Sequence, residues 1–435
     1  MTRSASRPAA TNLLICTVGG SHEPILRAIE ELRPAYTCFL CTGRDPATRA
    51  PGSRIQIEGR GKVIHAARGD SKPTLPAIRI QAGIEADAYQ VIEVPADDMD
   101  GAYALAARAI AELGARFPDA AIHADYTGGT KTMSAALVLA ALDAEPPVAL
   151  HLVSGARADL ERVRRHTERG APANVARIRL RRRMAPFLDA WARYAYDEAA
   201  AGLAAIAMPA DADARGTLLL AGDLSAAFAA WDRFDHAAAL ERLFAYRNRI
   251  GRDLNDHLGA LGYLTRDCPE REPLRLLDLW HNAERRAVQG RYDDAVARAY
   301  RLIEWSAQWL LDTRLAIKTA DIPAERVPAG VNLEPDRDGK RKAGLYLSWS
   351  LIGHWCGESP AGAFFAAARD ELRHHLQARN ASILAHGFAP IDAGVWTKLH
   401  GWLDTAFLPM LREEIKLARI RAEVPQLPAR YLWDD

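Results

Sequence analysis

The stretch Ala121–Met133, with the sequence AIHADYTGGTKTM, decides the fold of this chain. Its first four residues are mostly apolar and predict a short buried strand. The segment Asp125–Lys131 then brings two glycines and two threonines before a helical pattern begins. A strand that passes through a glycine-rich turn into a helix is the repeating unit of a parallel α/β sheet. Ligands of such sheets bind at the carboxyl ends of the strands.

The same alternation runs through the first third of the chain. Four further strands are predicted at Asn12–Val18, Tyr36–Cys41, Tyr89–Val94 and Val148–Val153. Helical patterns follow at His22–Leu32, Gly101–Phe117 and from Lys131 to about Leu142. We therefore expect a Rossmann-like parallel sheet, covered by helices on both faces, over residues 11–156, after a disordered polar tail at 1–10. The segment Thr42–Ala88 shows no clear pattern.

Two loops are expected at the ligand-binding edge of this sheet. Thr17–His22 follows the first strand, and Asp125–Lys131 follows the fourth. Their glycines let backbone N–H groups approach a ligand, and a helix N-terminus favours phosphate. Lys131 adds a positive charge. Either loop alone is explained as a simple turn, but two loops at equivalent positions favour a phosphate-bearing ligand.

Familiar nucleotide-binding motifs are missing. No G-x-G-x-x-G follows the first strand, which argues against a dinucleotide cofactor. Lys131 follows Thr130 rather than a glycine, so the G-x-x-x-x-G-K-[ST] pattern of NTPases is absent as well. We expect no cofactor at this site.

The composition is that of a soluble protein. The net charge of +1 gives no overall attraction to nucleic acid or to membranes. The chain has five cysteines, which favours a reducing compartment over a disulfide framework. Cys38 and Cys41 form a C-x-x-C, but three residues apart in a strand they point to opposite faces, so we expect no metal site. With no signal peptide and no apolar stretch long enough to cross a bilayer, the prediction is a cytoplasmic protein.

Beyond residue 156 the patterns are helical. Residues 157–275 are expected to form a helical connector, and residues 276–430 a helical C-terminal domain. The connector begins with many arginines between Arg157 and Arg183, which we interpret as a solvated link rather than a nucleic-acid patch. Trp231–Ala237 resembles Gly290–Ala295, and each leads into an alanine-rich helix. Two copies do not make a solenoid.

The C-terminal domain carries a candidate catalytic group on the stretch RNASILAHG, Arg379–Gly387. Seven helical steps of about 100° fall about 20° short of two turns, so Arg379 and His386 project from one face of a predicted helix. Histidine moves protons near neutral pH, and the planar guanidinium of arginine matches phosphate oxygens. Asn380 can orient the phosphate or the imidazole. The trio fits metal-free RNA cleavage by the ribose 2′-hydroxyl, although such spacing also arises by chance on helix surfaces.

Both halves of the chain resemble known families. R-N-x-x-x-x-x-H at the end of a helical domain is similar to the catalytic motif of HEPN ribonucleases, which implies catalytic roles for Arg379, Asn380 and His386. Asp293–Leu310 resembles the first HEPN helix, with Arg301 and Glu304 as a structural pair. His374 and His375 are treated as surface residues or secondary RNA contacts.

The first third of the chain resembles the CARF (CRISPR-associated Rossmann fold) domain. T-G-G-T-K-x-M matches one CARF motif, and TVGGSHEP, Thr17–Pro24, resembles another. The ligand-binding residues that the resemblance implies are Thr17, Gly19, Gly20, Ser21, His22, Thr127, Gly128, Gly129, Thr130, Lys131 and Met133. CARF followed by HEPN is the layout of the ancillary ribonucleases of type III CRISPR systems.

That layout implies a homodimer that cleaves single-stranded RNA when cyclic oligoadenylate binds between its CARF domains. The resemblance suggests the tetra-adenylate first and the hexa-adenylate second as allosteric activator. Products with a 2′,3′-cyclic phosphate, no metal and no membrane partner are expected. Two alternatives remain. One is a sensor whose helical output module is not catalytic. The other is a CARF domain that also degrades its activator with help from Thr17, Ser21 or Lys131.

Overall fold

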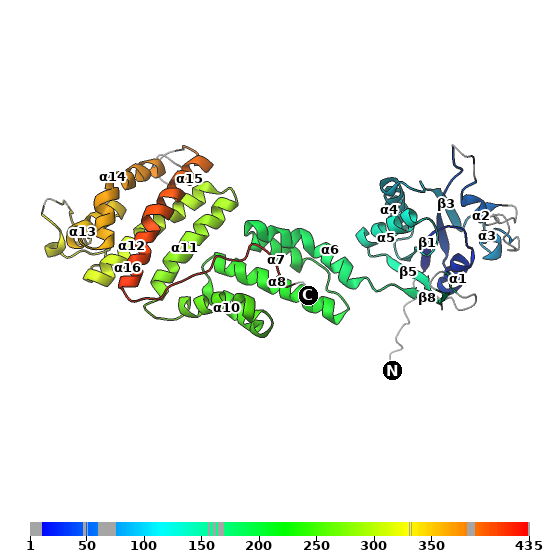
Figure 1. Cartoon of the computed structure of the whole chain (residues 1–435), viewed down its shortest axis with the longest axis horizontal. Coiled ribbons are helices and arrows are strands. Elements are labelled where there is room, and N and C mark those ends of the chain that lie inside the picture. The colour runs from blue at the N-terminus through cyan, green and yellow to red at the C-terminus, as the bar shows by residue number, and fades with distance from the viewer. Residues whose placement is uncertain are drawn as a thin grey trace. The chain divides into compact units, whose positions relative to one another are not determined.

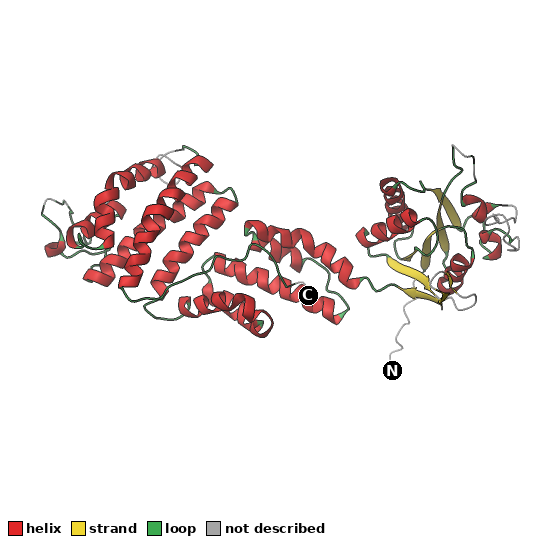
Figure 2. Ribbon diagram, in the orientation of Figure 1, coloured by secondary structure: helices red, strands yellow, loops and turns green. Residues whose placement is uncertain are grey.

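The computed structural model describes residues 11–46, 49, 51–59, 75–154, 157–159, 162–163, 169–329, 331, 333–380 and 388–433. The polar tail at 1–10 lies outside them. The chain divides into two compact units, Met1–Arg179 and Leu180–Asp435. Among the described residues every strand belongs to the first unit, and the second consists of helices and loops (Figure 2).

The first unit is built on a six-stranded sheet in the order β3-β2-β1-β4-β5-β8. Its strands are β1 (Asn12–Thr17), β2 (Tyr36–Cys41), β3 (Tyr89–Glu93), β4 (Ala121–Asp125), β5 (Ala149–Ser154) and β8 (Arg169–Pro172). The pairs among β1 to β5 are all parallel, which confirms the expected sheet. β8 runs antiparallel to β5, so the sheet is mixed rather than wholly parallel.

The sixth strand is what the sequence reading missed. We expected only a solvated link here, but the segment contains β6 (Arg157–Asp159), β7 (Arg162–Val163) and β8. β6 and β7 form a separate two-stranded hairpin. The sequence of β8, RGAP, has no apolar run. β8 is an edge strand that pairs only with β5, and such strands need not be apolar along their whole length.

Helices cover both faces of the sheet. α4 (Met99–Arg116) and α5 (Lys131–Asp143) lie on one face. α1 (Glu23–Leu32), α2 (Arg54–Glu58) and α3 (Ile78–Gln81) lie on the other (Figure 1). Successive residues of a strand point to opposite faces. In β1, accordingly, Leu13 and Ile15 pack with the α4–α5 core, and Leu14 and Cys16 pack with the α1 core.

The C-x-x-C is structural. Cys38 belongs to the core under α4 and α5, and Cys41 to the core under α1, so the two thiols face opposite sides of the sheet as expected. Burial raises the pKa of each thiol to about 12. Within the described ranges no three His, Cys, Asp or Glu side chains are grouped as a metal site would need. No helix of this part of the chain is long and apolar enough to cross a membrane.

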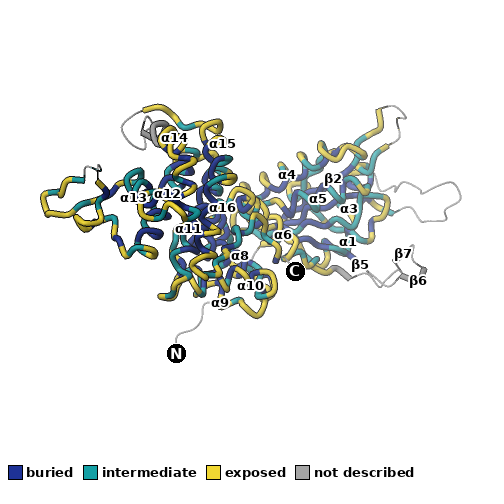
Figure 3. Tube along the Cα trace, turned by 60° about the vertical axis from the view of Figure 1, so that its left-hand side comes forward, coloured by how far each residue is buried: buried dark blue, intermediate teal, exposed yellow. Residues whose placement is uncertain are grey.

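The second unit is a stack of helices. They are α6 (Ala176–Leu188, which starts in the first unit), η1 (Asp189–Arg193), α7 (Tyr196–Ala204), α8 (Ala212–Asp232), α9 (His236–Ala245), α10 (Arg247–Leu264), α11 (Arg271–Val288), α12 (Tyr292–Leu315), η2 (Ala324–Arg326), α13 (Leu345–Trp355), α14 (Pro360–Asn380), α15 (Ala393–Trp402), η3 (Leu403–Phe407) and α16 (Leu408–Leu417). One hydrophobic core runs from Ala190 to Trp433. Figure 3 shows the buried residues along the helix faces that meet there.

The two similar motifs of the helical region have a third copy. The chain turns between helices at Tyr194, Phe234 and Gly290, each with a left-handed φ of 56°, 64° and 72°. In each corner the left-handed residue donates its N–H to the carbonyl three positions back, and the next residue donates to the carbonyl five positions back. The sequence AWARYAY, residues 190–196, is thus the counterpart of AWDRFDH, residues 230–236. Three connections between helices therefore share one geometry.

Candidate functional site

The two glycine loops meet at the point where the strand order reverses. From β1 the sheet continues to β2 and β3 on one side and to β4 and β5 on the other. β1 and β4 are direct neighbours, so the loops after Thr17 and after Asp125 leave the sheet side by side. In open α/β sheets this switch point is where ligands bind. The topology therefore confirms that the two loops lie at the same edge of the sheet.

The two loops contact each other directly. Thr17 Oγ1 donates a hydrogen bond of 2.7 Å to the carbonyl oxygen of Gly128. A Cβ atom on Gly19 would lie 2.6 Å from the amide nitrogen of Gly129, which is closer than side chains tolerate. Gly129 also has a left-handed φ of 81°. The glycines are needed here because one loop packs directly on the other.

A buried acid fixes the start of the second loop. Asp125 is 0% exposed, and its Oδ1 accepts the N–H of Thr127 at 2.9 Å. Its Oδ2 lies 2.9 Å from Nδ1 of His151 on β5. Thr127 Oγ1 in turn accepts the N–H of Val153 at 2.9 Å. The sequence reading missed His151, whose only signal was a polar residue inside an apolar strand.

The end of the second loop begins helix α5. Thr130 Oγ1 accepts the N–H of Met133 at 3.2 Å and donates to the carbonyl oxygen of Ala96 at 2.8 Å. A capping threonine satisfies one of the free N–H groups at the helix start. The remaining N–H groups and the helix dipole favour an anion at this position. Lys131, the first residue of α5, is exposed beside them.

The side chain of His22 is buried and contacts the segment between β2 and β3. Its side chain is 2% exposed, and its Nδ1 lies 2.8 Å from Nε2 of Gln81 on α3. Burial lowers the pKa of His22, so the neutral imidazole is favoured. His22 therefore ties the first loop to the segment between β2 and β3.

The candidate ligand residues fall into three groups by exposure. Gly20, Ser21 and Lys131 are exposed. Those of intermediate exposure are Gly19, Thr127, Gly128, Gly129 and Thr130. Thr17, His22 and Met133 are buried. Since the buried three hold the loops together, a ligand at this edge has access to the first two groups. Thr17 in particular already uses its hydroxyl as a donor to Gly128.

The candidate catalytic residues are placed only in part. Arg379 and Asn380 are the last described residues of helix α14, and their side chains are not described. The sequence predicts that this helix continues to Ala385, but residues 381–387, with His386 among them, lie outside the described residues. The N-terminus of α14 is firmly held, since Glu414 Oε1 accepts the N–H of Ala361 at 2.9 Å. Glu414 is 1% exposed and is also paired with Arg314. The catalytic role of the trio stays a prediction.

Four further residues that the sequence analysis named have described side chains. His374 is exposed, as expected. His375 is half-buried: its ring packs against Trp402 with centroids 4.9 Å apart, and burial lowers its pKa. Arg301 and Glu304 form the expected pair, with Nη1 and Oε2 3.1 Å apart. This pair is exposed, so its contribution to stability is small.

Comparison with known proteins identifies the helical region. Residues 266–406 match the family model of the Csm6 HEPN domain, and the matched stretch contains both Arg379 and His386. No curated protein sequence matches the chain.

Two solved structures extend the comparison. Csm6 of Enterococcus italicus, bound to cyclic hexa-2′-fluoro-hexa-dAMP, aligns over 94% of this chain and 95% of its own, with a TM-score of 0.54 and 12% identity. Can2 of Sulfobacillus thermosulfidooxidans, in complex with cyclic tetra-adenylate, aligns over 72% of this chain and 71% of its own, with 14% identity. Its TM-score of 0.21 is too low to show a shared fold.

The sheet with its loops at the switch point is followed by a helical stretch, residues 266–406, that matches the Csm6 HEPN domain model. The chain as a whole has the fold of Csm6.

Proposed function

We propose that this protein is an endoribonuclease that is switched on by cyclic oligoadenylate and cuts single-stranded RNA in CRISPR antiviral defence. The observation that carries the proposal is the pairing of two sites in one chain. The glycine loops at the switch point of the sheet precede a Csm6 HEPN-family region that contains Arg379 and His386.

The loops suit an oligoadenylate because they offer groups for phosphate. The N-terminus of α5, the backbone of Gly128 and Gly129, and the exposed Lys131 lie at one edge of the sheet. Exposed Ser21 in the neighbouring loop adds a hydroxyl. Phosphate is favoured by helix N-termini and by lysine charge. In a homodimer, two such edges would hold one cyclic ligand.

The cutting step needs only groups of the motif. His386 removes the proton of a ribose 2′-hydroxyl, and the 2′-oxygen forms a bond to the adjacent phosphorus. The bond from phosphorus to the 5′-oxygen breaks, and that oxygen takes up the proton that His386 removed and leaves as a 5′-hydroxyl. Arg379 stabilises the extra negative charge on the phosphate, and Asn380 orients the reacting groups. The products are a 2′,3′-cyclic phosphate and a 5′-hydroxyl end.

Activation follows from different affinities for two states. If the ligand binds the cutting arrangement of the homodimer more tightly than the resting one, it shifts the population toward cutting. The ring size is open: Csm6 of Enterococcus italicus holds a six-membered analogue, but at 12% identity only the fold carries over. Both the tetra-adenylate and the hexa-adenylate therefore belong in the test.

The test incubates the protein with a fluorescent single-stranded RNA in EDTA, with each cyclic oligoadenylate and without any. Cleavage with one ring size and none without it is the expected result. Ligand binding without cleavage would point instead to a sensor with a non-catalytic helical output. Cleavage that EDTA abolishes would contradict the metal-free mechanism.

A further inference from the structure

The chain does not end with its last helix. After α16 and a short link, residues Val424–Trp433, here called the C-terminal strap, run back over the helical unit without forming a helix or strand (Figure 1). Between Arg421 and Arg430 no backbone-to-backbone hydrogen bond is found among the described residues. The strap is nevertheless well packed: Val424, Leu427 and Trp433 are buried. Side chains of other helices must therefore hold it.

Those side chains recognise the strap at every second residue. The carbonyl oxygens of Val424, Gln426 and Pro428 are bonded to His281 Nε2 at 3.1 Å, His257 Nε2 at 3.1 Å and Tyr196 Oη at 2.7 Å, respectively. A carbonyl oxygen can only accept, so the two imidazoles and the phenol donate. The donors come from α11, α10 and α7. Recognition of alternate main-chain groups by a protein surface is typical of bound extended peptides.

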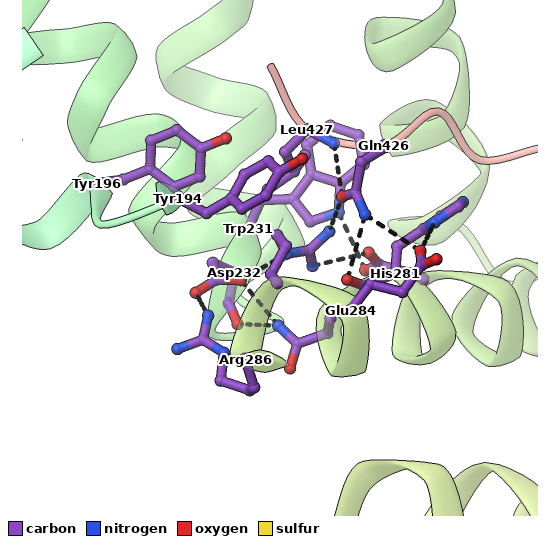
Figure 4. Close-up of polar contacts among 12 residues, drawn as sticks. Tyr194, Tyr196, Trp231, Asp232, His281, Glu284, Arg286, Gln426 and Leu427 are labelled. Atoms are coloured by element: carbon purple, nitrogen blue, oxygen red, sulfur yellow. Dashed lines mark hydrogen bonds and ion pairs between the residues drawn. The ribbon is translucent and has the colours of Figure 1, made fainter. Parts of the chain in front are cut away.

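Gln426 anchors the middle of the strap (Figure 4). Its Oε1 accepts a hydrogen bond of 2.7 Å from Nη1 of Arg285, which is 0% exposed. Its Nε2 donates to the carbonyl oxygen of His281 at 3.3 Å. Arg285 also donates through Nε to Asp232 at the second helix corner, 2.7 Å away. One glutamine of the strap therefore completes the bonding of a buried guanidinium, which is costly to leave unpaired.

Aromatic side chains anchor the end of the strap. Tyr431 and Trp433 both meet the edge or face of Trp191, with centroids 5.5 Å and 6.3 Å apart. Trp191 belongs to the first helix corner and is 0% exposed. The indole Nε1 of Trp433 donates to Asp253 Oδ2 on α10 at 3.1 Å. Large aromatic anchors with one polar tip are characteristic of binding hot spots.

We propose that η1, α7, α10 and α11 form a docking surface for an extended peptide, and that its ligand is the strap of this same chain. The surface binds the backbone of the strap through His281, His257 and Tyr196. It binds the side chains of Gln426 and Trp433 through Arg285 and Trp191. Since α11 lies in the HEPN-family region and α7 and α10 precede that region, the docked strap fastens the two together. This is independent of any cleavage activity.

Because the strap is tethered, it competes with a free peptide at a high effective concentration, and the intact protein should bind no peptide added in trans. The test uses the full chain with Gln426→Ala and Trp433→Ala combined, and a fluorescent peptide of residues 422–435 as probe. Fluorescence anisotropy should show at least tenfold tighter binding to this variant than to the unchanged protein. Leu432→Ala, at a strap residue that is 68% exposed, is the matched control and should behave as the unchanged protein.

Hydrogen exchange in α12 reports whether the variant remains folded, and Gln426→Ala alone replaces the double variant if that protection is lost. A peptide carrying Gln426→Ala should bind the folded variant at least tenfold more weakly than the native peptide. Failure of the native peptide to bind a folded variant would overturn the proposal. So would equal binding to the variant and the unchanged protein, or equal binding of both peptides.

Discussion

Thr17 donates its hydroxyl hydrogen to the carbonyl oxygen of Gly128 over 2.7 Å, although 111 residues separate the two in the chain. Thr17 ends β1, and Gly128 lies in the loop after β4, the neighbouring parallel strand. The bond and the close glycine contact between Gly19 and Gly129 join the two candidate ligand loops into one edge. At this edge we therefore expect some substitutions to lower the stability of the protein and others to lower its affinity for the ligand.

Gly129→Ala should destabilise the first unit, because its φ of 81° is strained for alanine and the new Cβ would lie 2.8 Å from Cβ of Thr17. Backbone strain of this kind costs about 1–3 kcal/mol. Gly20→Ala is the control, since its Cβ would meet no atom within 4 Å. A change of within about 0.5 kcal/mol is expected there. Urea denaturation of both variants measures the difference, and equal losses would contradict the loop packing.

Lys131→Ala should weaken binding of cyclic oligoadenylate without unfolding the protein, because Lys131 is exposed at the start of α5. A hydrogen bond to a charged group contributes about 1.5–3 kcal/mol, which corresponds to roughly 10- to 100-fold in affinity. Titration with a labelled ligand measures it. Arg108→Ala, which removes a charge that is 65% exposed on α4, should leave the affinity unchanged.

His386→Ala and Arg379→Ala should each abolish RNA cleavage and leave ligand affinity unchanged. General acid–base groups contribute typically 10²- to 10⁴-fold to the rate, so a loss of about this size is expected for His386. Arg369→Ala, an exposed arginine on the same helix, is the control for loss of charge. Cleavage that persists in the His386 variant would contradict the HEPN mechanism.

Asp278→Ala should strongly destabilise the helical unit. Asp278 is 0% exposed and accepts from Trp231 and His236 at 3.0 Å and from Arg285 at 3.3 Å. Removing one partner of a buried ion pair costs about 3–5 kcal/mol. Asp235→Ala, which removes only the exposed helix cap of α9, should cost about 1 kcal/mol. The free energy of unfolding in urea distinguishes them.

Low pH should lower the stability of the helical unit through protonation of Asp278. Burial alone would raise the pKa of Asp278, but hydrogen bonds from His236 and the charge of Arg285 hold it below its ordinary value. The unfolded chain therefore takes up this proton first as the pH falls. The stabilisation is present above about pH 4 and is lost as the pH falls further. Asp278→Asn should flatten this part of the stability profile.

His257 should cause a second loss of stability, at a higher pH than the loss through Asp278. Burial lowers its pKa below the ordinary value of about 6.5, and its neutral form donates to Gln426 of the strap. Below about pH 6.5 the unfolded chain binds this proton and the folded chain does not, so stability falls as the pH falls. His257→Gln keeps a donor but does not titrate. Its urea midpoint should change less between pH 7.5 and 5.5 than that of the unchanged protein.

Strand and helix positions were largely readable from local pattern. The apolar runs at β1 to β5 and the glycine turns after β1 and β4 predicted the parallel sheet, because burial on both faces demands continuous apolar strands. β8 was missed because an edge strand lacks that demand. The first helix corner, at Tyr194, was also missed, because its left-handed φ is visible only in the folded backbone.

The sequence by itself determined the class of fold, the two candidate loops and the Arg379–His386 spacing, because each depends on residues close together in the chain. Only the tertiary structure decided which loop residues are buried and which are exposed. It also decided that Asp125 pairs with His151 and that the strap docks on α7, α10 and α11. These contacts join residues up to 232 positions apart, and such pairings follow from the packing of the whole chain rather than from any local pattern.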